Sequence, residues 1–330
     1  MADPLRLVFM GSDAVALPLL DWLAGEGGAA AKLVGIFTGP DRPSGRGHAV
    51  GPNAVRAWAA GRAIGVLQPE RLGAEELAAL KALQPDVALV VAYGQILRDE
   101  FISAPRLGTL NLHASLLPLY RGASPIQAAI ASGDRETGMT LMRIIRELDA
   151  GPVAGEERVP IAALDTAAET GAALARAAVP LVARSLPLLA RGELSFRAQD
   201  PARASFCRRL GRADGVLDFA AGAPALAARI NALYPWPSVA VEMGGASVKL
   251  GLADALDGAP AGTPGTVLGS DADGLLVAAA PGVLRIRRLQ RPGGRMLGAG
   301  EFLRGFPVPA GALIPSRPMA ALVAASPLRR

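Results

Sequence analysis

Short apolar runs alternate with helical stretches through the first half of the chain. The runs that predict strands are Leu5–Phe9, Leu33–Thr38, Val87–Ala92 and Thr109–His113. The stretches that predict helices between them include Ala14–Ala24, Val55–Ala60 and Glu75–Leu83. Such alternation is typical of parallel βαβ units, and the wholly apolar run at 87–92 predicts a strand covered by helices on both faces. We therefore expect an α/β fold with a Rossmann-like, mostly parallel sheet.

The pattern changes in the second half. A long Ala/Leu-rich helix is predicted from Thr166 to about Ala190, and a charged, helix-like stretch runs from Ser205 to Ile230. Short alternating runs then predict strands at Ser247–Leu252, Gly265–Leu268, Leu275–Ala280 and Val283–Leu289. They indicate a smaller antiparallel C-terminal β-barrel or sandwich, and we expect the barrel, similar to an OB fold. The expected domains are residues 1–194 and 205–330, joined by a polar linker at 195–204, and residues 316–330 are expected to form a poorly packed tail.

Composition narrows the possible chemistry. The 330 residues are 51% hydrophobic but only 4% aromatic, and no run of 18 apolar residues lacks a charge, Pro or Gly, so we expect no membrane span. The single cysteine, Cys207, excludes an intramolecular disulfide, and two histidines, His48 and His113, leave no His/Cys cluster for zinc. The apolar run at Leu5 lacks the charged lead of a secretion signal, which favours the cytoplasm. We expect chemistry from few side chains and no metal.

The charge is divided unevenly along the chain. Residues 1–200 hold 19 basic and 21 acidic residues, a net charge of −2, whereas residues 201–330 hold 15 and 8, a net charge of +7. Such a split suggests that the second part meets a polyanion, most commonly a nucleic acid. Arginine supplies all but three of the 34 basic residues, and Ala, Gly and Pro are abundant. A compositional bias that gives a basic surface without a partner therefore stays open as an alternative.

The most informative segment begins on the predicted strand Thr109–His113. In open α/β sheets, ligands bind beyond the carboxyl ends of the strands. Alternation places Asn111 and His113 on one face of this strand and Leu112 on the other. An amide and an imidazole thus converge at the carboxyl end, where a polar pair needs partners if it has no function.

Asp149 is a third candidate. It lies in the turn that follows the strand-like Met139–Ile145, where an aspartate commonly caps the backbone. If this turn folds over the end of the Asn111/His113 strand, Asp149 would instead hold His113 in its charged form. The three side chains suit addition to a carbonyl, because amide and imidazolium would stabilise the oxygen of a tetrahedral intermediate while the carboxylate manages the proton. Ser115 is poorly placed for a Ser-His relay, and the sequence has no G-x-S-x-G elbow.

The block from Asn111 to Gln127, together with Asp149, resembles the folate-dependent formyltransferases. These share an N-x-H pair, an S-L-L-P-x-x-R-G loop and a downstream aspartate. Three further segments resemble the branch of this family that acts on methionyl-tRNA, namely Met10-Gly11-Ser12-Asp13, the loop Phe37–Gly47 and Ala232–Pro237. The resemblance runs from about Leu5 to about Pro309 and implies the formyltransferase fold.

By this resemblance, Asn111, His113 and Asp149 match the family's catalytic trio. The donor would be 10-formyltetrahydrofolate, and the acceptor would be the α-amino group of methionine carried by initiator tRNA. The residues that match the folate site are Ser115, Leu116, Leu117 and Pro118 beside the donor, with Ala92, Tyr93, Gly94 and Ile96 at the pterin pocket. A pterin needs backbone groups at a strand end and apolar walls, which the second segment offers.

The resemblance also implies residues that bind tRNA. Arg42 and Arg46 lie in a Gly/Pro-rich loop that matches the family's insertion toward the tRNA acceptor end; without the resemblance, such a loop is merely exposed. The chain departs from the family after Gly47, where His48-Ala49-Val50 stand in place of lysines. This weakens the expected electrostatic binding of the loop to tRNA phosphates. The basic second part is expected to compensate through Arg209 and Lys249, with Arg208, Arg212, Arg285, Arg287, Arg288, Arg291 and Arg295 as further candidates.

Other functions stay open at this point. The nearest alternative is a formyltransferase that acts on a nucleotide-sugar amine; one that acts on glycinamide ribonucleotide would not need the residues beyond position 200. A non-catalytic RNA-binding protein is a second alternative. A dinucleotide-dependent oxidoreductase is a third, but Gly11-Ser12-Asp13 offers no G-x-G-x-x-G. The leading expectation is a cytoplasmic, monomeric transferase with a folate donor and a tRNA acceptor.

Overall fold

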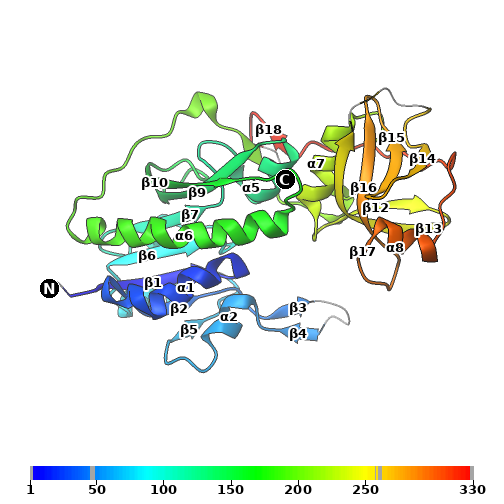
Figure 1. Ribbon diagram of the computed structural model, residues 1–330. Helices are drawn as coiled ribbons and strands as arrows, with labels where there is room; N and C mark the ends of the chain where they lie inside the picture. Colours follow the sequence, from blue (N-terminus) through cyan, green and yellow to red (C-terminus); the bar gives the residue numbers. More distant parts are fainter. Residues whose placement is uncertain (1–2, 45–48, 257, 259–261, 328–330) are drawn as a thin grey trace. The chain divides into compact units, whose positions relative to one another are not determined.

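A computed structural model describes residues 3–44, 49–256, 258 and 262–327 of the chain (Figure 1). The chain divides into two compact units. The first comprises the residues up to Gly122, Gly138–Val159 and Gly171–Ala204, and the second comprises Ala123–Thr137, Pro160–Thr170 and the residues from Ser205 onward. The expected domain boundaries at residues 194 and 205 stay a prediction, which limited proteolysis would test.

The core of the first unit is a seven-stranded sheet in the order β10-β9-β7-β6-β1-β2-β5. Neighbouring strands from β7 to β5 pair in parallel, whereas β7 and β9 are antiparallel. The expected mostly parallel α/β fold is thus confirmed. The strands are β1 (Leu5–Gly11), β2 (Ala31–Phe37), β5 (Val66–Leu67), β6 (Val87–Val91), β7 (Thr109–His113), β9 (Glu136–Arg143) and β10 (Val153–Pro160).

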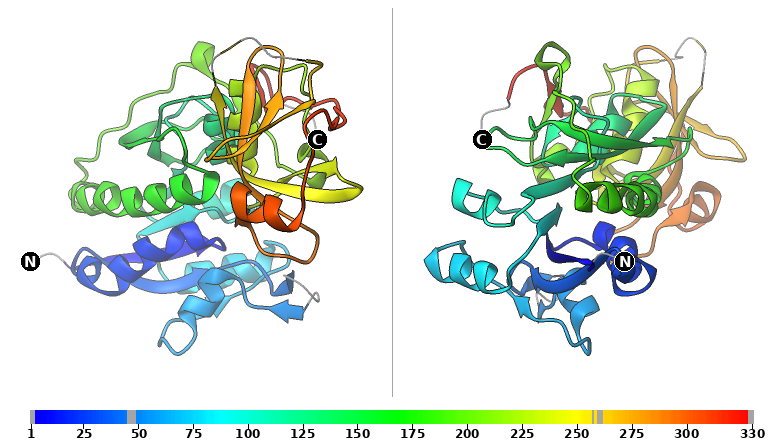
Figure 2. Two further views of the ribbon diagram at one scale, coloured as in Figure 1. Left: turned by 45° about the vertical axis from the view of Figure 1, so that its right-hand side comes forward. Right: turned by 90° about the vertical axis from the view of Figure 1, so that its left-hand side faces the viewer.

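Helices cover both faces of this sheet. Figure 2 shows α1 and α6 along one face and the cyan α3 and α4 along the other. Val8 and Met10 of β1 share a buried cluster with Leu80 of α3, while Phe9 between them is fully buried on the opposite side. The strands are therefore apolar on both faces, as their unbroken apolar runs predict. The helices are α1 (Leu17–Ala24), α2 (Ala54–Ala59), α3 (Ala74–Ala82), α4 (Asp99–Ile102) and α6 (Ala167–Ala190).

The 24 residues of α6 are long and apolar enough for a membrane-crossing helix. Its apolar side, however, is packed inside the protein: Leu174, Leu181 and Val182 are at most 1% exposed. Arg176 and Arg184 interrupt the apolar sequence, and Pro180 lies inside the helix. Burial against protein accounts for the apolar character of α6.

An antiparallel sheet in the order β12-β13-β16-β15-β14, with β17 paired to β16, forms the core of the second unit. Alternation in β13 buries Val248 and Leu250 and leaves Lys249 exposed. The expected C-terminal antiparallel domain is confirmed. Its strands are β12 (Val239–Met243), β13 (Ala246–Leu256), β14 (Val267–Ser270), β15 (Leu275–Ala278), β16 (Val283–Gln290) and β17 (Leu297–Gly298).

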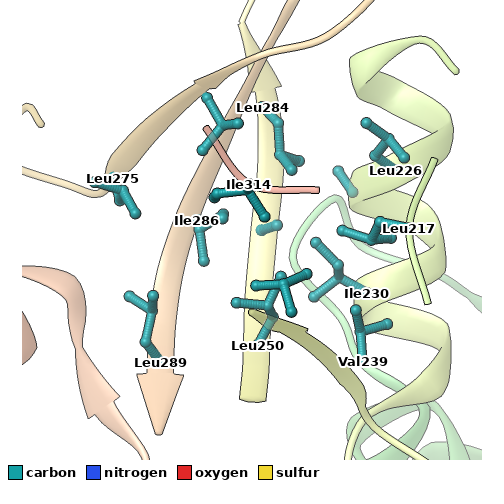
Figure 3. Close-up of a cluster of buried hydrophobic side chains, with 14 of the residues drawn as sticks. Leu217, Leu226, Ile230, Val239, Leu250, Leu275, Leu284, Ile286, Leu289 and Ile314 are labelled. Atoms are coloured by element: carbon teal, nitrogen blue, oxygen red, sulfur yellow. The ribbon is translucent and has the colours of Figure 1, made fainter. Parts of the chain in front are cut away.

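The helix α7 (Ala223–Leu233) packs on this sheet. Figure 3 shows Leu226 and Ile230 of α7 directed toward strand residues that include Leu250 and Leu284, all four of them fully buried. Asn231 of α7 exchanges two hydrogen bonds of 2.9 Å with the backbone of Ala253 in β13, which fixes the helix on the sheet. The remaining helices of the unit are α5 (Pro125–Ala131) and α8 (Ala299–Gly305).

Two expectations for the second half are wrong. The helix expected over 205–230 begins only at Ala223, because Gly211 and Gly215 interrupt the stretch before it and Asp214 accepts a hydrogen bond from the Gly211 amide instead of facing solvent. The first residues of that stretch form a short strand, β11 (Phe206–Cys207).

The tail expected to be loosely packed is held in place up to residue 324. Leu322 is buried, and the buried guanidinium of Arg229 donates to the carbonyl of Ala320 at 3.1 Å. The short strand β18 (Val323–Ala324) then pairs with β11. Leu322 thus joins the core of the second unit, with Met319 and Val323 packed against it, while the residues between them stay exposed.

Candidate active site

The carboxyl end of β7 presents the polar pair expected from the sequence. Asn111 pairs in register with Met142 of β9, and His113 pairs with Thr140. Leu112 is buried on the opposite face of the strand. The side chain of Asn111 is half-buried, and among the described residues it has no hydrogen-bond partner. An amide at this position is available to a ligand.

His113 is 6% exposed and has a neighbour at each ring nitrogen. Nε2 lies 2.9 Å from the carbonyl oxygen of Tyr120, and because a carbonyl only accepts, Nε2 carries the proton and donates. Nδ1 lies 3.7 Å from Oδ2 of Asp149, which is an ion-pair distance when the ring is charged but too long for a hydrogen bond. The structure thus brings His113 and Asp149 together, and both ring nitrogens face protein atoms.

Asp149 lies in the turn between β9 and β10 and has a left-handed backbone, with φ of +48°. The side chain is 14% exposed, and Oδ2 accepts a hydrogen bond of 2.8 Å from the amide of Gly122. The turn is tight at Gly151, where a Cβ atom would stand 1.8 Å from the carbonyl oxygen of Arg143. Only glycine fits there, so the turn that carries Asp149 requires Gly151.

Gln199 and Arg121 support this turn through hydrogen bonds, and neither was predicted from the sequence as a site residue. Gln199 lies in the segment expected to be a linker, and its Nε2 donates to the carbonyls of Asp149 at 2.8 Å and Gly151 at 2.7 Å. Its Oε1 accepts two hydrogen bonds from Arg121, which belongs to the short strand β8 (Arg121–Gly122). Burial lowers the pKa of the Arg121 guanidinium, and the nearby Asp149 carboxylate opposes this shift. A lone glutamine in a polar segment carries no pattern that would single it out.

The Ser115–Pro118 loop is organised by Thr140 of β9. Thr140 Oγ1 donates to the carbonyl of Ser115 at 2.6 Å and accepts from the amide of Leu117 at 3.2 Å. Ser115 is fully buried and its hydroxyl donates to the carbonyl of Leu119. Leu116 and Pro118 remain partly exposed. A ligand at this loop would therefore meet Leu116, Pro118 and backbone rather than the Ser115 hydroxyl.

The segment after β6 has an exposed and uncharged surface. Ala92 and Gly94 both have positive φ, of +48° and +79°, and both are exposed. Ile96 is 76% exposed, which is unusual for a large aliphatic side chain. Tyr93 points inward, and burial, with a contribution from Glu76, raises its pKa, so its phenol is neutral at physiological pH. Backbone groups and the Ile96 side chain are what this segment offers to a ligand.

The loop that carries Arg42 forms a hairpin of two short strands, β3 (Arg42–Ser44) and β4 (Ala49–Gly51). Its root is fixed at Gly39, whose amide donates to Ser12 Oγ and whose carbonyl accepts from Asn53 Nδ2, both at 2.8 Å. The Arg42 side chain is 71% exposed and approaches Glu70 at 3.4 Å. Arg46 and His48 lie outside the described residues.

The basic candidates of the second unit fall into two groups. Arg209 and Lys249 are exposed, as expected for residues that bind a polyanion. Arg285 and Arg287 instead pair with Asp254, and the two hydrogen bonds from Arg285 to its carboxylate are 2.9 and 2.7 Å. Arg208 pairs with the buried Asp214. The charges of Arg208, Arg285 and Arg287 are therefore balanced inside the unit.

Among the described residues, no group of three or more His, Cys, Asp or Glu side chains could hold a metal ion. The candidate site consists of an amide, an imidazole and a carboxylate that lie near the carboxyl end of β7. Such a set can bind a developing oxyanion and move a proton.

Comparison with known proteins gives a consistent result over both parts of the chain. A family model described as "Formyl transferase" matches residues 5–186, and one described as "Formyl transferase, C-terminal domain" matches residues 209–307. A methionyl-tRNA formyltransferase of Aromatoleum aromaticum is 40% identical over 94% of this chain and 97% of its own length. One of Granulibacter bethesdensis is 42% identical, with the same coverage of both chains. In fold, the sugar 3N-formyl transferase WlaRD is similar with a TM-score of 0.64, at 14% identity over 86% of this chain and 98% of that one.

Proposed function

The chain belongs to the formyltransferase family, and we propose that it transfers the formyl group of 10-formyltetrahydrofolate to the α-amino group of methionyl-initiator tRNA. The product is N-formylmethionyl-tRNA, which starts protein synthesis. The methionyl-tRNA formyltransferases of Aromatoleum aromaticum and Granulibacter bethesdensis are about 40% identical to this chain over nearly its whole length. The nucleotide-sugar amine remains as a second acceptor only through similarity of fold, which does not determine function.

The amide of Asn111, which has no hydrogen-bond partner within the described part of the chain, carries this proposal together with the His113/Asp149 pair. In the reaction, the α-amino nitrogen forms a bond to the formyl carbon, and the bond from that carbon to N10 of the folate later breaks. Negative charge develops on the formyl oxygen between these steps. Asn111 Nδ2 donates a hydrogen bond to this oxygen, because the Asn111 amide has no competing partner among the described residues.

His113 acts through its charge. Since Nε2 donates to Tyr120 and Nδ1 faces Asp149, the ring has a fixed orientation in a buried place. A proton on both ring nitrogens would place a positive charge opposite the Asp149 carboxylate and close to the developing oxyanion, where a charge is worth more than in water. The proton that leaves the ammonium nitrogen passes, through Asp149 or a water molecule, to N10 of the departing folate.

The donor would lie against the uncharged segment after β6. The exposed Ile96 side chain offers an apolar contact, and the backbone at Ala92 and Gly94 offers hydrogen-bonding groups. A Cβ atom at Gly94 would meet nothing within 4 Å, so the backbone there is open to a ligand. An uncharged pterin fits such surroundings better than a phosphate does. Leu116 and Pro118 would lie beside the donor.

The tRNA would be bound by exposed arginine and lysine side chains. Arg42 on β3 and Arg46, which follows it in the sequence, would meet the acceptor end. Arg209 and Lys249 would contact the tRNA backbone. Salt-dependent contacts of this type supply affinity without sequence readout. We further propose that the protein works as a monomer in the cytoplasm, which sedimentation and cell fractionation would test.

The proposed function is tested by offering two acceptors. The purified protein is incubated with 10-formyltetrahydrofolate and either methionyl-initiator tRNA or a dTDP-linked amino sugar, and the formylated product is identified by mass spectrometry. We expect formyl-methionyl-tRNA and no formylated sugar. Transfer to the sugar alone would overturn the proposed acceptor, and transfer to neither would overturn the proposed function.

A further inference from the structure

The turn that carries Asp149 needs support that its own sequence does not provide. Asp149 has a left-handed backbone, a conformation that non-glycine residues adopt at a cost in energy. Its carboxylate must also keep its place 3.7 Å from His113 Nδ1. A residue in such a conformation persists only where the surrounding structure holds it.

Gln199 supplies this support from a distant part of the sequence. Its side-chain Nε2 donates to two carbonyls of the turn, those of Asp149 and Gly151, at 2.8 and 2.7 Å. The segment before Gln199 is itself anchored, since Arg197 and Val153 exchange two backbone hydrogen bonds of 2.8 Å at the start of β10. The amide of Gln199 therefore approaches the turn from a fixed backbone.

The other half of the Gln199 amide holds Arg121. Oε1 accepts from Nε of Arg121 at 3.1 Å and from Nη2 at 2.7 Å. Arg121 is 7% exposed and lies close enough to Asp149 for the two charges to interact. The residue that follows it, Gly122, donates its amide to Asp149 Oδ2. Gln199 thus fixes both the turn that carries the carboxylate and the residue next to the carboxylate's hydrogen-bond donor.

We propose that Gln199 is a positioning residue for formyl transfer, which acts through Asp149 by holding the turn and Arg121 at once. The inference rests on the proposed function for its kinetic readout. Only an uncharged amide satisfies both partners, because the carbonyls of Asp149 and Gly151 need a donor and the Arg121 guanidinium needs an acceptor. A glutamate would keep the contact with Arg121 but lose both donations to the turn.

Two substitutions separate the donor function of the Gln199 amide from its acceptor function. Gln199→Glu removes the two donated hydrogen bonds and keeps an acceptor for Arg121. Gln199→Met has a similar volume and removes the donor and the acceptor together. Gln84→Glu is the matched control, because Gln84 is exposed and lies at the end of α3, before β6 begins. Melting temperatures establish that each variant is folded, and the Glu variant carries the test if the Met variant does not fold.

The kinetic measurement is single-turnover formyl transfer together with the KM of each substrate. Both Gln199 variants should lower kcat by about tenfold or more, the scale expected when a reacting group is misplaced by a fraction of an ångström to one ångström. The KM values should stay within about threefold of those of the unsubstituted protein, because both polar atoms of the Gln199 amide are already hydrogen-bonded within the protein. An unchanged kcat in a folded Gln199→Glu variant would overturn the proposal.

A second readout does not depend on activity. The chain has only two histidines, so the ring ¹⁵N resonances of His113 can be assigned by comparison with a His48→Gln variant. At one fixed pH, both Gln199 variants should displace the His113 resonances in the direction produced by Asp149→Asn, and Gln84→Glu should leave them in place. If the His113 resonances do not move in the Gln199 variants, the proposed role of Gln199 is overturned, whether or not formyl transfer is detected. If the unsubstituted protein transfers no formyl group, the proposed function fails separately.

Discussion

Nδ1 of His113 and Oδ2 of Asp149 lie 3.7 Å apart, although one residue ends a buried strand and the other lies in a turn between two other strands. The carboxylate is held by the Gly122 amide, and the imidazole is held by the Tyr120 carbonyl. Both partners belong to the loop and strand that follow β7. The His113/Asp149 pair is therefore oriented by backbone groups of the fold.

Loss of the Asp149 charge should impair catalysis and leave folding intact. In Asp149→Asn, the amide oxygen can still accept from Gly122, while the negative charge that faces His113 is gone. We expect kcat to fall by about 10²-fold, with KM values within a fewfold of the original and an unchanged melting temperature. Steady-state kinetics on both substrates checks this. An unchanged kcat would mean that Asp149 only caps the turn.

Arg42 should affect tRNA more than folate. Its side chain is 71% exposed, and its contact with Glu70 at 3.4 Å is a surface ion pair that contributes little to stability. We expect Arg42→Ala to raise the KM for tRNA by at least fivefold and the KM for folate by less than twofold. Glu70→Gln is the control, because it leaves the guanidinium free and should not weaken tRNA binding. Equal increases in both KM values would indicate that the hairpin shapes the donor site.

The exposed basic residues of the second unit should appear in the salt dependence of tRNA binding. If Arg209 or Lys249 contacts a phosphate, its replacement by Gln should reduce the slope of log K against log salt by about 0.7 to 0.9. Arg191, which pairs with Glu193 in the first unit, provides the control substitution. Filter binding at several salt concentrations measures the slope. An unaltered slope in both variants would remove these two residues from the interface.

The second unit should lose stability in acid through Asp254. Hydrogen bonds from Arg285, with a further contribution from Arg287, lower the pKa of this carboxyl from 3.8 to about 2. As pH falls below about 4, the unfolded chain binds a proton before the folded one does, so stability is lost progressively down to about pH 2. The contribution is on the order of 2 kcal/mol. Asp254→Asn should flatten the fall in unfolding free energy between pH 5 and pH 2.5, whereas Glu242→Gln, at an exposed carboxylate on β12, should not.

The sequence predicted those parts of the fold whose patterns are long and regular. The unbroken apolar run at β6 identifies a strand buried on both faces, and alternation in β13 separates the buried Leu250 from the exposed Lys249. The stretch before α7 was wrongly predicted to be helical, because its charges are spaced like those of a helix. Gly211 and Gly215 interrupt the helix there. Strands of three residues, as in the β3–β4 hairpin, are too short to leave a pattern.

The candidate site was predictable where chemistry-bearing side chains share one strand. Asn111 and His113 are two residues apart, so alternation alone places them together. That Asp149 reaches His113 depends on the turn after β9, which the sequence could suggest but not place. Gln199 was missed because its role comes from three backbone and side-chain partners that are distant in sequence. Contacts of that kind leave no local signal.

The single-turnover rate of formyl transfer in the Asn111→Ala variant tests the account most directly. The assay combines enzyme in excess with 10-formyltetrahydrofolate and methionyl-initiator tRNA and follows formyl-methionyl-tRNA. Because Asn111 has no other partner among the described residues, its removal should leave folding unchanged and lower the rate by about 10²-fold or more, the scale for loss of one oxyanion donor. His113→Ala should be impaired at least as strongly. A near-normal rate in the folded Asn111→Ala variant would contradict the proposed mechanism.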